Sequence, residues 1–202
     1  IQAGAFTGSL RAGRALFDAA AQRPEPIPSF AEMGSLNPVF VLPNALAERS
    51  DAIADGLAQS VNMGVGQFCT CPGLAVGVGL ESFAETLRTR FAQAKAGTML
   101  TPAIADSYRN AIAHITTLSG VRATLGDGPA LFEVDSKTFL AHPELRHEIF
   151  GPSTILVHCS TQSEVEQVAR SLEGSLTATL HATEADLRAH PALLAILARK
   201  AG

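Results

Sequence analysis

Short apolar runs alternate along this chain with longer stretches in which apolar residues recur at helical spacing. The apolar runs predict buried strands over residues 39–42, 74–78, 130–134, 154–158 and 176–180, with a further apolar run over residues 1–8. The helical spacing predicts helices over residues 9–21, 45–61, 81–96, 102–118, 163–172 and 183–198. Because strands and helices alternate, the pattern predicts an α/β fold with an open, largely parallel sheet and flanking helices.

Prolines mark the interruptions of this pattern. Residues 23–28 hold three prolines, and each fixes φ and removes a donor, so we expect an extended connection into a strand that carries Glu32. Pro191 is expected to interrupt or kink the last helix. A domain boundary is expected near residues 32–35. The first helix is expected to turn inward the side that holds Leu10, Ala15, Leu16 and Ala19.

Composition excludes several classes of protein. The net charge is −4, no basic run occurs, and one Tyr with no Trp leaves few stacking surfaces, so we expect no nucleic-acid partner. The longest strongly apolar stretch, residues 73–80, is too short to cross a bilayer, so we expect no membrane partner. Three cysteines do not form a disulfide framework, which favours a reducing, cytoplasmic setting. The six histidines show no metal-ligand spacing, so no metal site is predicted.

The chain begins with Ile1 rather than Met and shows no signal-peptide pattern. It opens within a predicted element. We therefore expect it to be a fragment of a longer protein, and we expect the missing residues to carry part of the function.

Cys69 is the strongest candidate for chemistry. Gln67, Thr70 and Pro72 surround it and are poor core residues, so the sequence predicts an accessible thiol on a loop over residues 64–73. Glu32 lies earlier in the chain and could act as a carboxylate base. A thiol nucleophile and such a base are the two parts that acyl-thioester chemistry needs. Cys71 stays open as a bystander, a resolving thiol or the true nucleophile.

Two further segments could hold a nucleotide. Glu148 and Phe150 lie on a Gly-Pro turn, where a carboxylate and a ring could hold a ribose and its base, or could simply begin the next strand. Gly8 and Ser9 join a strand to a helix, where free N–H groups bind phosphate, although an ordinary helix cap explains them equally well. The sequence from Gly77 to Ser82 is similar to a glycine-rich dinucleotide-binding motif but has Ser in place of the third glycine, so we expect close strand packing there instead.

Four segments, in this order, resemble motifs of the aldehyde dehydrogenase superfamily. They are Phe6-Thr7-Gly8-Ser9, Glu32-Met33-Gly34-Ser35, Gly66-Gln67-Phe68-Cys69 and Glu148-Ile149-Phe150-Gly151-Pro152. Met33 and Ser35 depart from the usual Leu and Gly, and Leu74 stands where the family commonly has Arg. The E-M-G-S-x-N-P and G-Q-F-C-T-x-P-G segments are most similar to the branch that holds α-ketoglutaric semialdehyde dehydrogenases and a bacterial fatty-aldehyde dehydrogenase.

The resemblance implies oxidation of a small aldehyde, with α-ketoglutaric semialdehyde as a candidate, to an acid with NAD or NADP. Cys69 would be the nucleophile and Glu32 the base, and the chemistry would pass through a thiohemiacetal and a thioester. Gly8 and Ser9 would lie by the pyrophosphate, and Glu148 and Phe150 by the nicotinamide ribose.

The resemblance also implies a division into domains. Residues 1–31 would end a Rossmann-like cofactor domain, and residues 32–202 would form a catalytic domain that is incomplete at its C-terminus. It implies a homodimer or homotetramer, and an isolated chain without turnover. Two rivals stay open: a non-catalytic assembly module of the same fold, and a thiol hydrolase that pairs Cys69 with a histidine.

Overall fold

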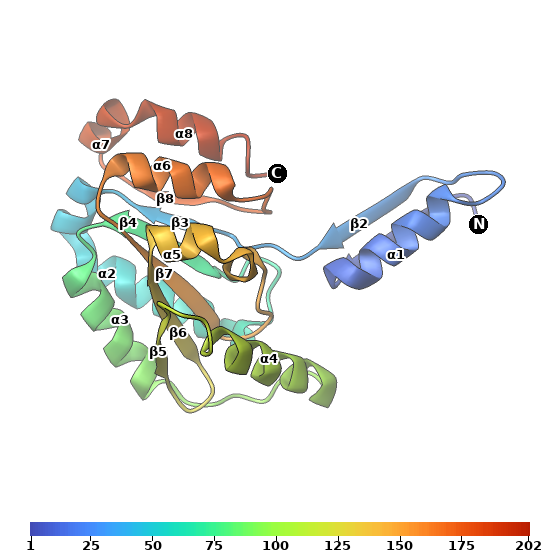
Figure 1. The fold of residues 1–202 in the computed structure, drawn as a ribbon, viewed down its shortest axis with the longest axis horizontal. Coiled ribbons are helices and arrows are strands. Elements are labelled where there is room, and N and C mark those ends of the chain that lie inside the picture. Colours follow the sequence, from blue (N-terminus) through green and yellow to red (C-terminus); the bar gives the residue numbers. More distant parts are fainter. The chain divides into compact units, whose positions relative to one another are not determined.

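Parallel strands form a sheet in each of the two units into which the chain divides, an N-terminal unit, Ile1–Gly34, and a C-terminal unit, Ser35–Gly202. The computed structural model describes all 202 residues (Figure 1).

The N-terminal unit is a parallel pair of strands with one helix. β1 (Gly4–Gly8) leads into α1 (Leu10–Ala21), and the chain returns as β2 (Ser29–Met33) beside β1. The Ser9 hydroxyl accepts the Ala12 N–H at 3.4 Å and so caps the start of α1. The predicted strand and helix of this region are therefore present. The proline segment between α1 and β2 is irregular rather than extended, with bends over residues 23–25 and a hydrogen bond from Ile27 N to Ala20 O.

The predicted inner face of α1 is wrong. Leu10 and Leu16 are each 51% exposed, and Gly13 is the one buried residue of the helix. A Cβ at Gly13 would lie 2.3 Å from Met33 Sδ and 3.2 Å from a carbon of the Phe6 ring. The helix approaches its strands through a glycine because no larger residue fits there, and apolar periodicity does not reveal such a contact.

The C-terminal unit is a six-stranded sheet with helices on both faces. The strand order is β5-β6-β7-β4-β3-β8, and every neighbouring pair is parallel except β5 and β6. The predicted largely parallel α/β sheet is therefore confirmed. The strands are β3 (Val39–Val41), β4 (Leu74–Val78), β5 (Arg122–Leu125), β6 (Ala130–Asp135), β7 (Ser153–Cys159) and β8 (Thr179–His181).

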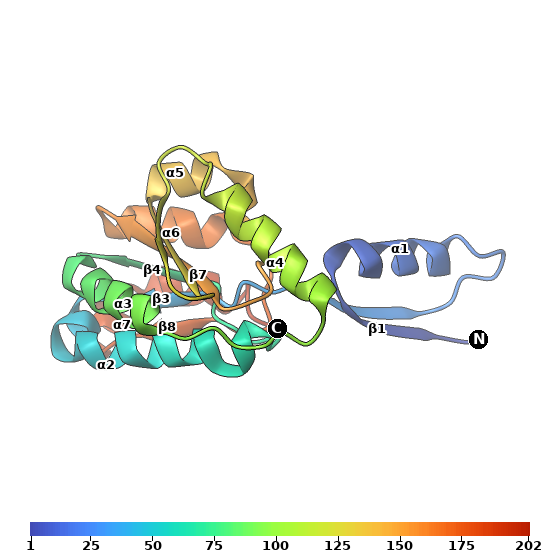
Figure 2. The same cartoon turned by 90° about the horizontal axis from the view of Figure 1, so that it is seen from below.

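Helices cover both faces of this sheet, with α2 and α3 on one side and α5 and α6 on the other (Figure 2). None of the helices is long and apolar enough to span a membrane. The helices are α2 (Pro43–Asn62), α3 (Glu81–Gln93), α4 (Pro102–Ile115), α5 (Ser136–Ala141), α6 (Gln162–Ser171), α7 (Glu184–Ala189) and α8 (Pro191–Leu197), with short 3₁₀ turns at Met63–Gly66 and Pro143–Arg146.

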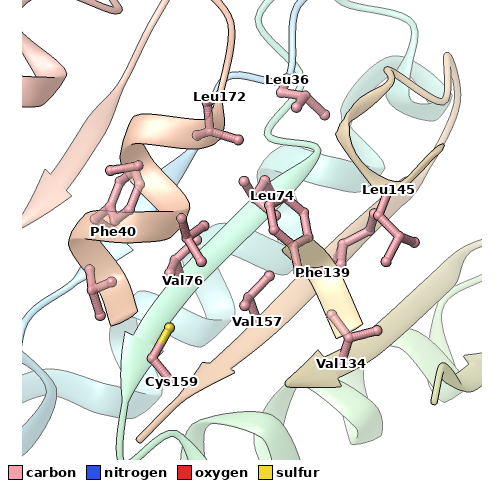
Figure 3. Packing of buried hydrophobic residues seen from close by; sticks show 14 of the residues in the cluster. Leu36, Phe40, Leu74, Val76, Val134, Phe139, Leu145, Val157, Cys159 and Leu172 are labelled. Carbon is pink, nitrogen blue, oxygen red and sulfur yellow. The ribbon is translucent and has the colours of Figure 1, made fainter. Parts of the chain in front are cut away.

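Alternating strand residues supply the two cores. Phe40 packs into the core on the α5–α6 side, while its neighbours Val39 and Val41 pack against α2 and α3. Val157 and Leu156 divide between the two faces in the same way, as the period of two in a strand requires. Figure 3 shows the core on the α5–α6 side, where Cys159 lies among aliphatic side chains. Because both faces are covered, the strands read as continuous apolar runs.

Some elements differ from the sequence prediction. The antiparallel edge strand β5 and the short helix α5 were not predicted, since β5 is mostly exposed and α5 has only six residues. The predicted strand over residues 176–180 is shorter and later, as β8. Pro191 does interrupt the last predicted helix, because it begins α8 as a separate helix after α7.

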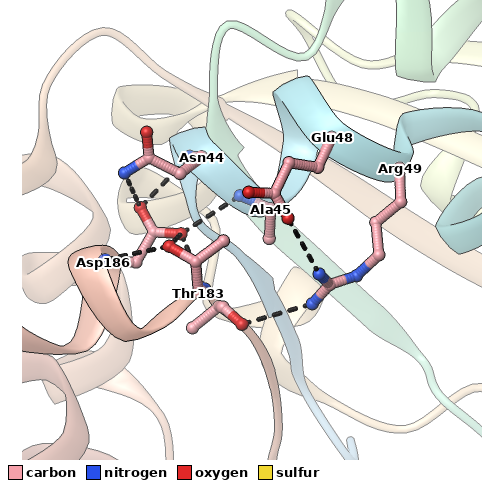
Figure 4. A network of polar contacts seen from close by, with 7 residues as sticks. Asn44, Ala45, Glu48, Arg49, Thr183 and Asp186 are labelled. Carbon is pink, nitrogen blue, oxygen red and sulfur yellow. Dashed lines mark hydrogen bonds and ion pairs between the residues drawn. The ribbon is translucent and has the colours of Figure 1, made fainter.

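A buried carboxylate joins the start of α2 to the start of α7. Asp186 Oδ1 accepts the Asn44 backbone N–H at 3.1 Å and the Asn44 side-chain amide at 2.8 Å (Figure 4). Its Oδ2 accepts the backbone N–H groups of Ala45 at 3.1 Å and Thr183 at 2.9 Å. Burial would raise the pKa of Asp186, but these hydrogen bonds outweigh it and hold the pKa below its usual value. One side chain therefore satisfies donors at two helix ends.

A second buried carboxylate, Glu133, links strands β5, β6 and β7 to helix α3. Glu133 on β6 is 3% exposed and lies 2.8 Å from Arg88 Nε of α3, 2.7 Å from Arg122 Nη2 of β5 and 2.9 Å from His158 Nε2 of β7. Burial would raise its pKa, but the hydrogen bonds with His158, Arg88 and Arg122 lower it to about 2. The charge therefore favours the folded state at neutral pH.

We expect the Glu133→Gln variant to lose about 3 kcal/mol of unfolding free energy at pH 7, because the pKa of the carboxylate falls on folding. The folded-state pKa of about 2 lies below the ordinary value of 4.5, so this stabilisation is present above pH 4.5 and is lost as the pH falls toward 2. Urea unfolding at several pH values measures both effects. Glu173→Gln, at an exposed position, is the matched control and should change little. Equal stability of the two variants at pH 7 would contradict this role.

Candidate active site

The Cys69 loop begins with three consecutive left-handed residues. Gly64, Val65 and Gly66 have φ values of 56°, 58° and 65° in the turn that follows α2. Left-handed backbone suits glycine, but it strains a β-branched residue such as Val65. The chain turns here after a long helix, and Gln67, Phe68 and Cys69 follow on an irregular segment. The sequence predicted a loop at this place, over residues 64–73.

Backbone hydrogen bonds and two side chains hold the rest of the loop. The Asn37 side-chain amide donates to the carbonyl of Cys69 at 2.8 Å and to that of Cys71 at 3.0 Å. The Cys71 N–H donates to Phe68 O at 3.0 Å, and the Gly73 N–H donates to Leu36 O at 2.9 Å. The Gln67 side chain also donates to Gly64 O at 3.1 Å and accepts from Leu100 N at 2.8 Å. The loop is therefore held in place around Cys69, whose own side chain is exposed.

The loop packs directly on the Glu148–Pro152 segment. A Cβ at Gly66 would lie 2.2 Å from the carbonyl carbon of Gly151 and 2.4 Å from Pro152 N, so the two backbones touch where no side chain fits. Tyr108 supports this contact from α4, since its hydroxyl lies 2.8 Å from Gly128 O and 3.1 Å from Pro152 O. Two of the four predicted motifs are thus brought together in one unit.

The three thiols differ sharply in environment. Cys69 is exposed, Cys71 is half-buried and Cys159 is buried in the core. Burial, with the nearby charge of Glu148, raises the pKa of Cys71 to about 12, and burial, with Glu164, raises that of Cys159 to about 12. Because the thiolate is the nucleophile, Cys71 and Cys159 are poorly suited to attack a carbonyl at neutral pH. Cys69 is the accessible thiol.

Glu148 and Phe150 lie beside this loop. Burial raises the pKa of Glu148, although a hydrogen bond from the backbone N–H of Ser35 partly opposes the shift. Phe150 is 38% exposed, so its ring presents an apolar surface that a bound molecule could cover. A cleft of about 420 Å³ is lined by Asn37, Thr70, Pro72 and Thr177, together with residues of α2, β3 and β8.

The remaining predicted residues belong to the N-terminal unit. Glu32 lies on β2 opposite Thr7 of β1, and Gly8 lies opposite Met33. Glu32 and Ser9 are exposed. The predicted residues therefore fall into two groups, with Cys69, Glu148 and Phe150 in the C-terminal unit and Glu32, Gly8 and Ser9 in the N-terminal unit.

Asn37 is a site residue that the sequence analysis did not single out. It is 2% exposed and has a φ of 47°, a conformation that Asn adopts more readily than most residues. The Asn-Pro pair within Ser35–Pro38 was noticed only as part of a motif. A polar residue directly before a buried apolar run was the signal for a buried hydrogen-bonded side chain.

Comparisons with known proteins identify the family. The Aldehyde dehydrogenase family matches residues 1–127. The chain is 46% identical over 214 residues to alpha-ketoglutaric semialdehyde dehydrogenase 2 of Azospirillum brasilense, and 39% identical over 219 residues to alpha-ketoglutaric semialdehyde dehydrogenase of Acinetobacter baylyi. All of the chain aligns in both cases, but it spans only 41% of each relative's length.

Solved structures show the same fold. Betaine aldehyde dehydrogenase of Staphylococcus aureus aligns with all of the chain and 43% of its own length, with a TM-score of 0.83 at 16% identity. PnpE in complex with nicotinamide adenine dinucleotide aligns with all of the chain and 44% of its own length, with a TM-score of 0.81 at 19% identity. The fold and the sequence match together define a thiol-bearing α/β protein of the aldehyde dehydrogenase type. The chain belongs to the aldehyde dehydrogenase family, as its motifs predicted.

We expect Gly66→Ala to destabilise the C-terminal unit by about 2–4 kcal/mol, because the new Cβ meets backbone atoms and the left-handed φ disfavours alanine. Thermal unfolding measures the change. Gly56→Ala is the matched control, since Gly56 lies within α2 and a Cβ there meets nothing within 4 Å. The control should stabilise by up to about 1 kcal/mol. Two variants of equal stability would refute the close contact at Gly66.

Proposed function

We propose that this protein oxidises an aldehyde to a carboxylic acid with NAD or NADP, with Cys69 as the nucleophile and Glu32 as the base. One observation carries the proposal: of three thiols, Cys69 alone is exposed, on a loop whose backbone is held in place. Its membership of the aldehyde dehydrogenase family supports the same chemistry.

The first step is addition of the Cys69 thiolate to the aldehyde carbon. The new C–S bond turns the carbonyl oxygen into an oxyanion and gives a thiohemiacetal. The backbone N–H of Cys69 donates to no acceptor within the protein, so it is available to stabilise that charge. The loop's hydrogen bonds fix this donor before substrate arrives, which is what makes such a donor effective.

The residues of the chain fit a dinucleotide. The Leu10 and Arg11 N–H groups at the start of α1 donate to no acceptor in the protein, and no acidic residue lies in this turn. Arg11 and Arg14 also lie on the helix, which supports a pyrophosphate beside Gly8 and Ser9. Glu148 and Phe150 would hold the nicotinamide ribose by hydrogen bonding and packing. A bound nicotinamide would accept the hydride that leaves the thiohemiacetal carbon, so that a thioester remains on Cys69.

Hydrolysis of the thioester completes the reaction. The Glu32 carboxylate takes a proton from water while the water oxygen attacks the thioester carbon. The C–S bond then breaks, and the carboxylic acid and the Cys69 thiol are released. The net change consumes the aldehyde, one oxidised nicotinamide dinucleotide and water, and it yields the carboxylic acid, the reduced dinucleotide and one proton.

The substrate proposal follows from the relatives. Both curated relatives carry the name α-ketoglutaric semialdehyde dehydrogenase, and we propose a semialdehyde of this kind as substrate. We further propose that residues 1–31 form the C-terminal end of a cofactor domain, and that residues 32–202 form a catalytic domain that is incomplete at its C-terminus. A cytoplasmic homodimer or homotetramer completes the proposal.

The experiment uses the full protein with α-ketoglutaric semialdehyde and follows reduction of NAD or NADP. We expect Cys69→Ser to lower kcat by at least about 10³-fold, and Glu32→Gln by about 10²–10⁴-fold, because one variant removes the nucleophile and the other a general base. Cys159→Ala, which removes a buried thiol, is the matched control and should keep activity. Turnover that survives in Cys69→Ser but is lost in Cys71→Ser would overturn the nucleophile assignment. Ester hydrolysis that tolerates Glu32→Gln would favour a thiol hydrolase.

A further inference from the structure

We propose that Asn37 is the positioning residue of the Cys69 loop, fixing the peptide that follows the thiol through its side-chain amide. The inference rests on the proposed function, in which Cys69 is the nucleophile. It concerns a residue that is 2% exposed and whose side chain bonds to the backbone of the loop.

Both the nitrogen and the oxygen of the Asn37 side-chain amide have several hydrogen-bond partners. Its Nδ2 donates to Cys69 O at 2.8 Å and Cys71 O at 3.0 Å, with Ser35 O a third acceptor at 3.3 Å. Its Oδ1 accepts from Ser35 Oγ at 2.7 Å, from Thr177 N at 3.2 Å and from Thr177 Oγ1 at 3.1 Å. Donors surround the oxygen and acceptors surround the nitrogen, so only one orientation of the amide satisfies the site.

Backbone conformation singles out the same residue. Asn37 and Val65 are the two non-glycine residues of the chain with positive φ. Val65 begins the Cys69 loop, and Asn37 lies beneath it. Strained backbone persists only where the surroundings enforce it, and it gathers at functional sites. Both non-glycine residues with positive φ therefore lie in the Cys69 loop or bond to it.

The hydrogen bond to Cys69 O has a consequence on the opposite side of the peptide. The chain has no cis peptide bond, so the Thr70 N–H points away from the Cys69 carbonyl and hence away from Asn37. Neither Cys69 N–H nor Thr70 N–H has an acceptor in the protein. By holding the carbonyl inward, Asn37 directs the Thr70 donor outward, next to the thiol-bearing residue.

A mere structural support would also be buried and hydrogen-bonded, so the two roles need separation. Asn37→Asp keeps the oxygen that faces the Ser35 hydroxyl and Thr177, and it replaces the donor with an oxygen that faces three carbonyls, two of them in the Cys69 loop. The substitution changes the side of the amide that touches the loop and leaves the other side in place. A positioning role predicts loss of kcat with KM preserved, because a side chain that is 2% exposed acts on the backbone of the loop.

The experiment measures kcat and KM of the full protein with α-ketoglutaric semialdehyde, together with thermal unfolding. We expect Asn37→Asp to lower kcat by about tenfold or more, with KM changed by less than about threefold. Asn110→Asp, at an exposed position of α4, is the matched control and should match the unchanged protein. A wild-type kcat in Asn37→Asp, or a fall in kcat that is matched by an equal loss of folded protein, would overturn the inference.

Thr177→Val provides the second variant if Asn37→Asp does not fold. It removes one hydroxyl donor to Asn37 Oδ1 without touching the Cys69 loop. We expect kcat to fall by about threefold at unchanged KM, and a wild-type kcat would overturn the inference. Cys69→Ser is measured in parallel. If this variant keeps its turnover, the proposed function itself fails. If it is inactive while Asn37→Asp is fully active, only the role of Asn37 is rejected.

Discussion

The carbonyl groups of an irregular loop must find donors where the loop turns into the protein, and in this chain one buried amide supplies them. Asn37 donates to the carbonyls of both Cys69 and Cys71. Without it, two buried or half-buried acceptors would lose their partners, at a cost of about 1–3 kcal/mol each. The exposed thiol, the free N–H groups and the close packing of Gly66 on Gly151 all depend on this fixed backbone.

The sheet beneath the loop is stabilised by two buried carboxylates with different tasks. Glu133 joins its own strand, β6, to α3, β5 and β7 through Arg88, Arg122 and His158. Asp186 joins the starts of α2 and α7, and it holds the first turn of α2, which lies before a break in that helix at Arg49. A carboxylate with several donors is stable when buried because each donor replaces lost hydration. The two carboxylates therefore hold the sheet and the start of α2, the helix that precedes the Cys69 loop.

The sequence predicted the parts whose signals are local and missed those that arise from contacts. The apolar strands β3, β4, β6 and β7 were predicted because both faces of the sheet are covered. The edge strand β5 has no such run, and the helix contact at Gly13 depends on a residue without a side chain. The Cys69 loop was predicted from Gly and Pro, but the role of Asn37 depends on acceptors far along the chain. The distance between Glu32 and Cys69 could not be predicted either, because local sequence patterns do not encode the separation of residues far apart in the chain.

Acylation of the protein by p-nitrophenyl acetate, followed by peptide mapping of all three cysteines, tests the central claim most directly. The claim is that Cys69 is the nucleophile and that Glu32 serves the water step. The predicted result is acetylation of Cys69 alone, with an acetyl group that persists longer in Glu32→Gln. Acetyl groups spread equally over Cys69, Cys71 and Cys159, or an acetyl-Cys69 that decays equally fast in both proteins, would contradict it.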